Sequence, residues 1–189
     1  MSSRLLIESI GSEAELRPLA MPEDVVAVEG LSNERRRCEV LAWRAMVRRE
    51  LGKDVAISYD DYGAPNVSLL DTYISVSHSR GVVALLISDA PCAVDIEHIA
   101  RNFRGVASKY LSIEELALAE RYDLYAEMWS AKETLYKYYR KGSLDLAQDI
   151  SIVEYSATDN TFVATILDSE PIVVKIERWG FYVVTSIAR

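Results

Sequence analysis

Residues Ala93–Glu97 alternate between polar and apolar side chains, and this stretch constrains the chain more than any other. On a β-strand, Asp95 and Glu97 point to one side, while Val94 and Ile96 point to the other. Two carboxylates on one side repel each other, so we expect a cation between them. A divalent metal such as Mg²⁺ suits this place, because hard cations prefer oxygen ligands.

A second polar face is predicted on the helical segment 129–137. Trp129, Glu133 and Lys137 are spaced by four residues and therefore share one helix face. The alternative for Glu133 and Lys137 is an exposed ion pair that contributes only ~0.3–0.5 kcal/mol. Trp129 favours a packed face. For Asp95 and Glu97 the alternative is a solvated strand face.

Three motifs follow one another in a fixed order: Ser-His-Ser at 77–79, Ala-Val-Asp-Ile-Glu at 93–97 and Trp-Ser-Ala-Lys-Glu-Thr-Leu-Tyr-Lys at 129–137. In this order they resemble the 4'-phosphopantetheinyl transferase superfamily. The resemblance covers roughly residues 63–141 and is faint elsewhere.

This resemblance implies transfer of phosphopantetheine from coenzyme A, the co-substrate, to a serine hydroxyl of an apo acyl or peptidyl carrier protein. Adenosine 3',5'-bisphosphate is the second product. A metal bridging the pyrophosphate would lower the repulsion between nucleophile and phosphate oxygens. The expected cofactor is Mg²⁺, with Mn²⁺ as an alternative.

The residue roles follow from the matched motifs. Asp95, Glu97 and Glu133 match the family's metal ligands. The predicted catalytic residues are Asp95, Glu133 and Lys137. Glu133 serves as a metal ligand or as the base for the serine proton, and the sequence does not separate these roles. Lys137 contacts the transferring phosphate.

Coenzyme binding is expected from five residues: Ser77, His78, Arg48, Arg44 and Lys132. His78 matches a family residue that donates to the 3'-phosphate of the coenzyme. Ser77 matches a residue that forms a hydrogen bond with a phosphate oxygen. Arg48 resembles, by its position in the helix, an arginine near the 3'-phosphate, with Arg44 as its competitor. The alternative for this arginine-rich helix is a solvated face paired with acids. The alternative interpretation of Lys132 is that it forms a structural ion pair.

Two residues depart from the family pattern. Ala93 stands where glycine is usual, and Ala64 stands where a basic residue is often found. A strand tolerates alanine, so we expect little loss at Ala93. Ala64 removes one expected cation from the loop 62–65.

Carrier docking is expected on the segment 101–110 through a local patch, because the chain has a net charge of -8 and carriers of this system are generally acidic. The alternative is an ordinary mobile loop. The patch would combine basic and apolar side chains: Arg101, Arg104, Lys109, Phe103, Val106 and Tyr110.

The fold expected from the pattern is α+β. The resemblance adds two similar lobes, residues 1–90 and 91–189, related by a pseudo-twofold axis, each with antiparallel strands on a long helix. One compact, monomeric chain would hold the site between the lobes. Expected strands lie near 4–10, 25–28, 73–76, 82–87, 93–97, 151–155, 162–167, 172–177 and 181–187. Residues 56–76 are expected to form a strand, a turn at 62–65 and a second strand. Expected helices start at Ser32, Ser112 and Asp123, and the Ser-His-Ser motif is expected in a turn.

Composition excludes several classes of protein. The N-terminus does not resemble a signal peptide, and no apolar run approaches the ~20 residues that span a bilayer. Cys38 and Cys92 form no metal or redox motif. We therefore expect a cytoplasmic protein. Its negative charge argues against general nucleic-acid binding.

Two other functions stay open from the residues. One is a coenzyme A or nucleotide-binding module without turnover, which would not need Lys137 or the full set of acids. The other is a Mg²⁺-dependent pyrophosphate hydrolase, which would act without a carrier protein.

Overall fold

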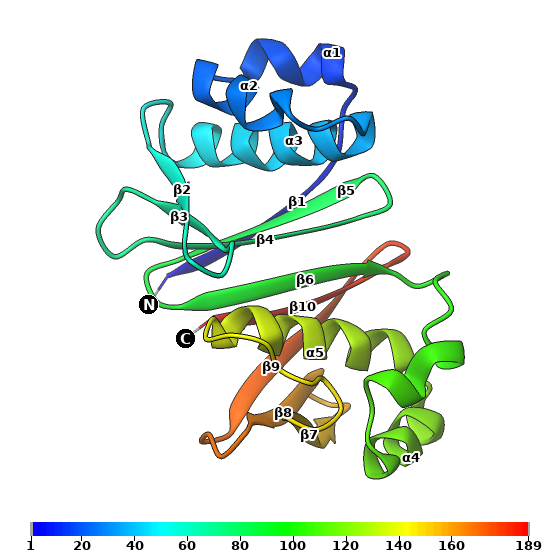
Figure 1. Ribbon diagram of the computed structural model, residues 1–189. Coiled ribbons are helices and arrows are strands. Elements are labelled where there is room, and N and C mark those ends of the chain that lie inside the picture. The colour runs from blue at the N-terminus through cyan, green and yellow to red at the C-terminus, as the bar shows by residue number, and fades with distance from the viewer. Residues whose placement is uncertain (1, 189) are drawn as a thin grey trace.

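The computed structural model describes residues 2–188, in which antiparallel sheets alternate with helices (Figure 1). The N-terminal half holds a three-stranded sheet in the order β1-β5-β4, formed by Ser3–Ser9, Val82–Ser88 and Tyr73–Ser79. A separate hairpin pairs β2 (Ile57–Tyr59) with β3 (Pro65–Val67). The C-terminal half holds a five-stranded sheet in the order β6-β10-β9-β8-β7, formed by Cys92–His98, Tyr182–Ala188, Ile172–Trp179, Thr161–Ile166 and Ile150–Ser156.

One long helix packs on each sheet. The helices are α1 (Glu13–Leu16), η1 (Arg17–Leu19), α2 (Pro22–Glu29), α3 (Glu34–Leu51), η2 (Arg104–Lys109), α4 (Ile113–Tyr122) and α5 (Tyr125–Tyr139). Figure 1 shows α3 across the three-stranded sheet and α5 across the five-stranded one. Buried Leu41 and Val47 of α3 meet Leu85 of β5, and buried Met128 and Leu135 of α5 share a core with the sheet behind them. None of the described helices has the length and apolarity that a membrane span requires.

The two sheets meet along β4 and β6, which lie side by side in the middle of the molecule (Figure 1). They share no backbone ladder. Instead, serine side chains of β4 accept backbone N–H groups of β6: Ser75 Oγ accepts from Val94 at 3.0 Å, and Ser79 Oγ accepts from His98 at 3.3 Å. An apolar cluster that includes Leu86 of β5 closes the other side of this contact.

Most predicted elements are confirmed. The expected strand at 4–10 is β1, the strand at 82–87 is β5, and the C-terminal meander is β7 to β10. The Ser112 capping box is present, since Ser112 Oγ accepts from Glu115 N at 3.2 Å and a Glu115 carboxylate oxygen accepts from Ser112 N at 2.8 Å. The alternation predicted at Ala93–Glu97 is also confirmed, because these residues form the middle of β6.

Several boundary predictions are wrong for local reasons. The expected strand 25–28 is helical, because Pro22 occupies the first turn of α2 and Asp24 accepts from Met21 N at 3.0 Å. The N-cap of α3 is Asn33, which accepts from Arg36 N at 3.2 Å, and not Ser32. Asp123 ends α4 in a left-handed conformation, φ 53°, and does not begin α5.

The Ser-His-Ser motif forms strand, and the expected turn starts later. Ser77, His78 and Ser79 are the last residues of β4. The chain reverses at Arg80 and Gly81, whose φ angles of 42° and 82° are those of a tight hairpin. The motif side chains therefore alternate across a strand, with Ser77 and Ser79 on the side of β6 and His78 on the other.

The predicted α+β class is confirmed, because antiparallel sheets and helices make up both halves of the described chain. Each half has an antiparallel sheet and one long helix, but one sheet has three strands and the other five. The pseudo-twofold relation and the division into 1–90 and 91–189 remain predictions.

Lys132 is fully buried, and its hydrogen bonds connect α5 to other buried segments of the C-terminal half. Its ammonium group donates to Glu115 Oε2 at 2.8 Å, to the carbonyl of Leu146 at 2.7 Å and to that of Ile150 at 2.5 Å. Burial lowers the pKa of Lys132, and hydrogen bonding to Glu115 opposes that shift. The structural ion pair, rather than a coenzyme contact, is what the structure contains.

Replacing Lys132 with methionine should destabilise the protein by about 3–5 kcal/mol, because it leaves the buried Glu115 carboxylate without its cation. Urea unfolding would measure this loss. Lys53→Met, at an exposed position, is the matched control and should change the free energy of unfolding by less than about 0.5 kcal/mol. Equal effects of the two variants would contradict the assignment.

Candidate functional site

Asp95 is a buried carboxylate in the middle of β6, and its partners come from both neighbouring elements. Ser77 of β4 donates to Oδ1 at 2.8 Å, and Ser130 of α5 donates to Oδ2 at 2.9 Å. The ammonium of Lys137 lies 2.7 Å from Oδ1. Asp95 thus joins three elements, and it brings the side chains of Ser77 and Lys137 together.

Glu97 lies two residues further along β6 and has a separate set of partners. Its Oε1 accepts from Arg101 Nη1 at 2.7 Å and from Trp129 Nε1 at 3.0 Å, and its Oε2 accepts from Ser79 Oγ at 3.0 Å. The guanidinium of Arg101 lies 4.8 Å from the centre of the Trp129 ring. Burial, and next the charge of Asp95, raises the pKa of Glu97.

Glu133 is the third predicted acid, and it lies in the middle of α5, close enough to Asp95 and Glu97 for their charges to act on it. Lys137 turns to Asp95, so Glu133 has no ion-pair partner within residues 2–188. Burial is the main cause of a raised pKa at Glu133, with the charge of Asp95 second and that of Lys137 opposing. A partly buried carboxylate with a raised pKa and no fixed partner is suited to accept a proton.

The three acids offer only oxygen donors, which is the chemistry that Mg²⁺ selects. Burial, and next repulsion from Asp95, raises the pKa of both Glu97 and Glu133, so a divalent cation would relieve the repulsive part of this shift. The positive charges of Lys137 and Arg101 already neutralise part of the negative charge of these acids. Across residues 2–188 no three acidic, histidine or cysteine side chains are grouped as a metal site. The metal therefore remains a proposal supported by donor chemistry.

His78 faces α3 at the other side of β4. Arg36 Nη1 lies 2.5 Å from His78 Nε2, and His78 Nδ1 lies 3.4 Å from Glu39 Oε1. Because a guanidinium can only donate, Nε2 acts as the acceptor and the proton resides on Nδ1. Burial lowers the pKa of His78, which keeps the ring neutral. Arg35 Nε also donates to Glu39, at 3.0 Å.

Arg44 and Arg48, expected near the coenzyme, lie elsewhere. Both are almost inaccessible, with 3% and 4% of their surface exposed, and both bind the buried carboxylate of Asp24. Arg48 also donates to the backbone carbonyls of Lys53 and Val55. These arginines join α2 to α3, and binding a phosphate would require this buried ion pair to break. The arginine that the fold places beside His78 is Arg36.

The expected docking segment is ordered and partly buried. Phe103 and Tyr110 are core residues with 2% and 0% exposure, because they pack on α5 and around Trp129. The interpretation of these two as exposed contacts is therefore wrong. Arg101, Arg104 and Lys109 are exposed. Residues 104–109 form the 3-10 helix η2.

The positions of Ala64 and Ala93 follow from their elements. Ala93 is buried in β6 opposite Ile187, an ordinary strand position. Ala64 lies in the turn between β2 and β3, where its N–H donates to Asp60 Oδ1 at 2.9 Å. A pocket of about 370 Å³ adjoins this turn and reaches Lys137.

Sequence reasoning missed three groups of this site: Ser75 and Ser79 of β4, Ser130 of α5, and the cations Arg36 and Arg140. The alternation of Ser75, Ser77 and Ser79 along one strand was a usable signal, since it places three hydroxyls on one side. Arg36 and Arg140 gave no such signal, because only the tertiary fold brings them to His78 and to the pocket.

Comparison with known proteins identifies the family of the chain. The model of the 4'-phosphopantetheinyl transferase superfamily matches residues 91–184, which include β6, α5 and the acids Asp95, Glu97 and Glu133. No curated protein matches the chain.

Replacing Glu133 with glutamine should raise the melting temperature at neutral pH. The folded state raises the pKa of Glu133, so its ionised form destabilises the fold, and this effect grows as pH rises through the folded-state pKa. The difference from wild type should shrink as pH falls toward 4 and vanish below the unfolded-state pKa of about 4.3, where the carboxyl is protonated in both states. Calorimetry across pH 4–8 tests this. A variant less stable than wild type at pH 8 would contradict it.

Proposed function

Because the chain belongs to the 4'-phosphopantetheinyl transferase superfamily, we propose that it transfers phosphopantetheine from coenzyme A to a serine of an apo carrier protein. Family membership supports phosphopantetheinyl transfer as the general reaction. The observation that carries the finer proposal is the joint placement of Asp95, Glu133 and Lys137 between β6 and α5, beside a pocket that reaches Lys137.

The reaction forms a bond between the serine oxygen and the β-phosphorus of coenzyme A. The bridging P–O bond breaks, and adenosine 3',5'-bisphosphate leaves. The serine proton must be accepted, and negative charge on the departing phosphate must be stabilised. We assign proton acceptance to Glu133, whose pKa burial and Asp95 raise. We assign stabilisation of phosphate charge to Lys137, which Asp95 holds at 2.7 Å.

Mg²⁺ is the proposed cofactor, with Mn²⁺ as an alternative, and Asp95, Glu97 and Glu133 would hold it. When bound, the metal would neutralise charge on the pyrophosphate. Ser77 and Ser130 fix the Asp95 carboxylate, while Trp129 fixes that of Glu97, so the chain orients two of the three acids before any ligand binds.

The 3'-phosphate of the coenzyme is assigned to His78 and Arg36. His78 carries its proton on Nδ1 and is half-exposed, and Arg36 is exposed beside it. Together they offer N–H donors near the surface, next to the strand that carries Ser77. Arg44 and Arg48 are not part of this assignment because Asp24 binds both.

Carrier docking is assigned to the exposed arginines near the N-terminal end of α5. Arg101 contacts Glu97 and Trp129, and Arg104 lies over Tyr125. In a chain of net charge -8, these cations form a local surface that complements an acidic carrier. A monomer located in the cytoplasm is consistent with this role and remains part of the proposal.

Intact-mass spectrometry of an apo carrier protein, incubated with this protein, coenzyme A and Mg²⁺, tests the reaction. We expect a mass gain of one phosphopantetheine. Glu133→Gln should lower the rate by about 10²–10⁴-fold and Lys137→Met by about 10²–10³-fold. Omission of the metal should abolish the gain.

Two results would favour other functions. Coenzyme A bound without modification of any of several carriers would indicate a binding module. Coenzyme A cleaved in the absence of a carrier would indicate a pyrophosphate hydrolase. The matched control for the variants is Lys53→Met, an exposed lysine outside both the site and the expected docking segment, which should modify the carrier at the wild-type rate.

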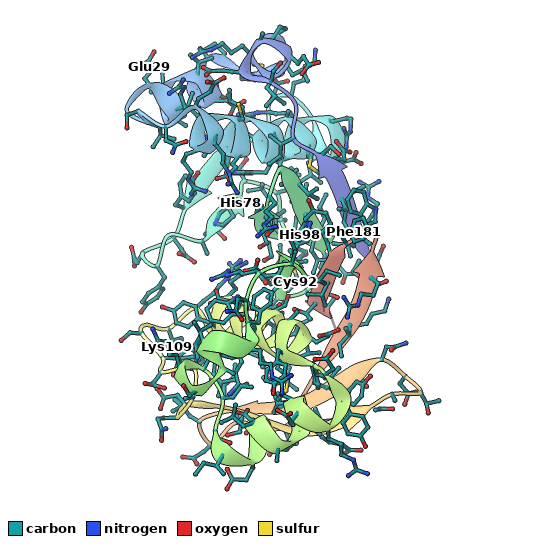
Figure 2. All side chains as sticks on the ribbon, turned by 90° about the vertical axis from the view of Figure 1, so that its right-hand side faces the viewer. Glu29, His78, Cys92, His98, Lys109 and Phe181 are labelled. Atoms are coloured by element: carbon teal, nitrogen blue, oxygen red, sulfur yellow. The ribbon has the colours of Figure 1, made fainter. Side chains whose placement is uncertain are left out.

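Replacing His78 with alanine should raise the KM for coenzyme A by about tenfold, because one hydrogen bond to a charged group is lost. The KM for dephospho-coenzyme A should change little, since this substrate lacks the 3'-phosphate. His98→Ala is the control. His98 lies on β6 and stacks on Phe181, and Figure 2 shows these two residues near each other. Its replacement should leave both KM values unchanged. Equal effects of His78→Ala on the two substrates would refute the assignment.

A further inference from the structure

Arg140 and Lys137 are the two cations of the pocket beside the acid cluster. The pocket holds about 370 Å³ and is bounded by the turn between β2 and β3, by β4 and by the C-terminal end of α5. No Asp or Glu belongs to its lining. In a chain of net charge -8, a cavity with two cations and no carboxylate in its lining suits an anion, although Asp95 pairs with Lys137 and Asp60 lies near Arg140.

The backbone of Arg140 is left-handed, with φ 48° and ψ 33°, immediately after α5. Glycine usually takes this place at a helix end, because residues with a Cβ adopt the conformation at a free-energy penalty. Such strain is often kept where a side chain has a function. The chain therefore keeps an arginine at a position where its backbone would favour glycine.

The guanidinium of Arg140 is only partly used by the protein. Nη2 donates to the carbonyl of Ile74 at 3.0 Å, and Nη1 lies 3.4 Å from Asn66 Oδ1. The nearest acid is Asp60, whose Oδ2 is 3.9 Å from Nη1. A guanidinium has five N–H donors, so donors remain for a ligand in the pocket. The side chain is 25% exposed, which keeps it accessible.

The position of Arg140 along α5 suggests which anion it meets. Trp129 and Arg101 lie at one end of the site, Glu133 and Asp95 in the middle, and Lys137 with Arg140 at the other. From residue 129 to residue 140 the helix rises about 16 Å. In phosphoryl transfer the attacking and leaving oxygens lie on opposite sides of the phosphorus. If the carrier docks at Arg101, the leaving group lies toward Arg140.

We propose that Arg140 binds the adenosine 5'-phosphate of coenzyme A, the phosphate not assigned to His78 and Arg36, and so acts with Lys137 on the leaving group. This inference rests on the proposed function and adds a residue to it. The competing explanation is a purely structural one, in which Arg140 only fastens the end of α5 to β3 and β4.

Arg140→Gly separates the two explanations, because it removes the side chain and also relieves the backbone. We expect the dissociation constants of coenzyme A and of adenosine 3',5'-bisphosphate, measured by calorimetry on the full chain, to rise about 10–100-fold. The melting temperature should stay within about 3 °C of wild type. Arg140→Lys, which keeps the charge, should lose less affinity than Arg140→Gly.

Leu167→Gly is the matched control. Leu167 is another non-glycine residue with positive φ, 52°, in the turn between β8 and β9, and it lines no part of this pocket. It should leave ligand affinity unchanged. The proposal is overturned if Arg140→Gly binds both ligands as wild type does, or if its affinity falls only together with a drop in melting temperature of more than about 5 °C. Wild-type protein that binds neither ligand would overturn the proposed function as well, which distinguishes the two failures.

Discussion

The buried carboxylate of Asp95 is the point at which both sheets and the long helix α5 meet. It accepts from Ser77 of β4 and from Ser130 and Lys137 of α5. Removing a buried carboxylate from water is costly unless hydrogen bonds and an opposite charge compensate it, and here all three donors do so. The same contacts that make the burial possible fix the geometry of the site.

This arrangement explains why the site lies where two sheets adjoin without a shared backbone ladder. The serines of β4 take over the hydrogen bonds that a neighbouring strand would make, and their hydroxyls reach both the backbone of β6 and its acids. Because no backbone ladder joins β4 to β6, polar side chains lie between these two strands. Structure and proposed chemistry thus depend on the same row of hydroxyls.

Charge in this protein is arranged in local clusters. Lys132 with Glu115, and Arg44 and Arg48 with Asp24, are buried pairs that hold elements together. The acids around Asp95 are instead incompletely neutralised, and burial with mutual repulsion raises the pKa of Glu97 and Glu133. Unbalanced charge marks the candidate site, whereas balanced charge marks the core. This contrast separates arginines and lysines that look alike in the sequence.

The sequence alone determined the strand with Asp95 and Glu97, the helix with Glu133 and Lys137, and the C-terminal meander, because these depend on periodicity within short segments. It did not determine which cations meet those acids. Arg44 and Arg48 were expected to be available to the coenzyme but are buried. Phe103 and Tyr110 were expected on the surface but belong to the core. Arg36 reaches His78 across 42 residues of chain, and Arg140 reaches Ile74 across 66. Only the tertiary structure decided these, because burial and long-range pairing depend on packing between segments that local sequence does not encode.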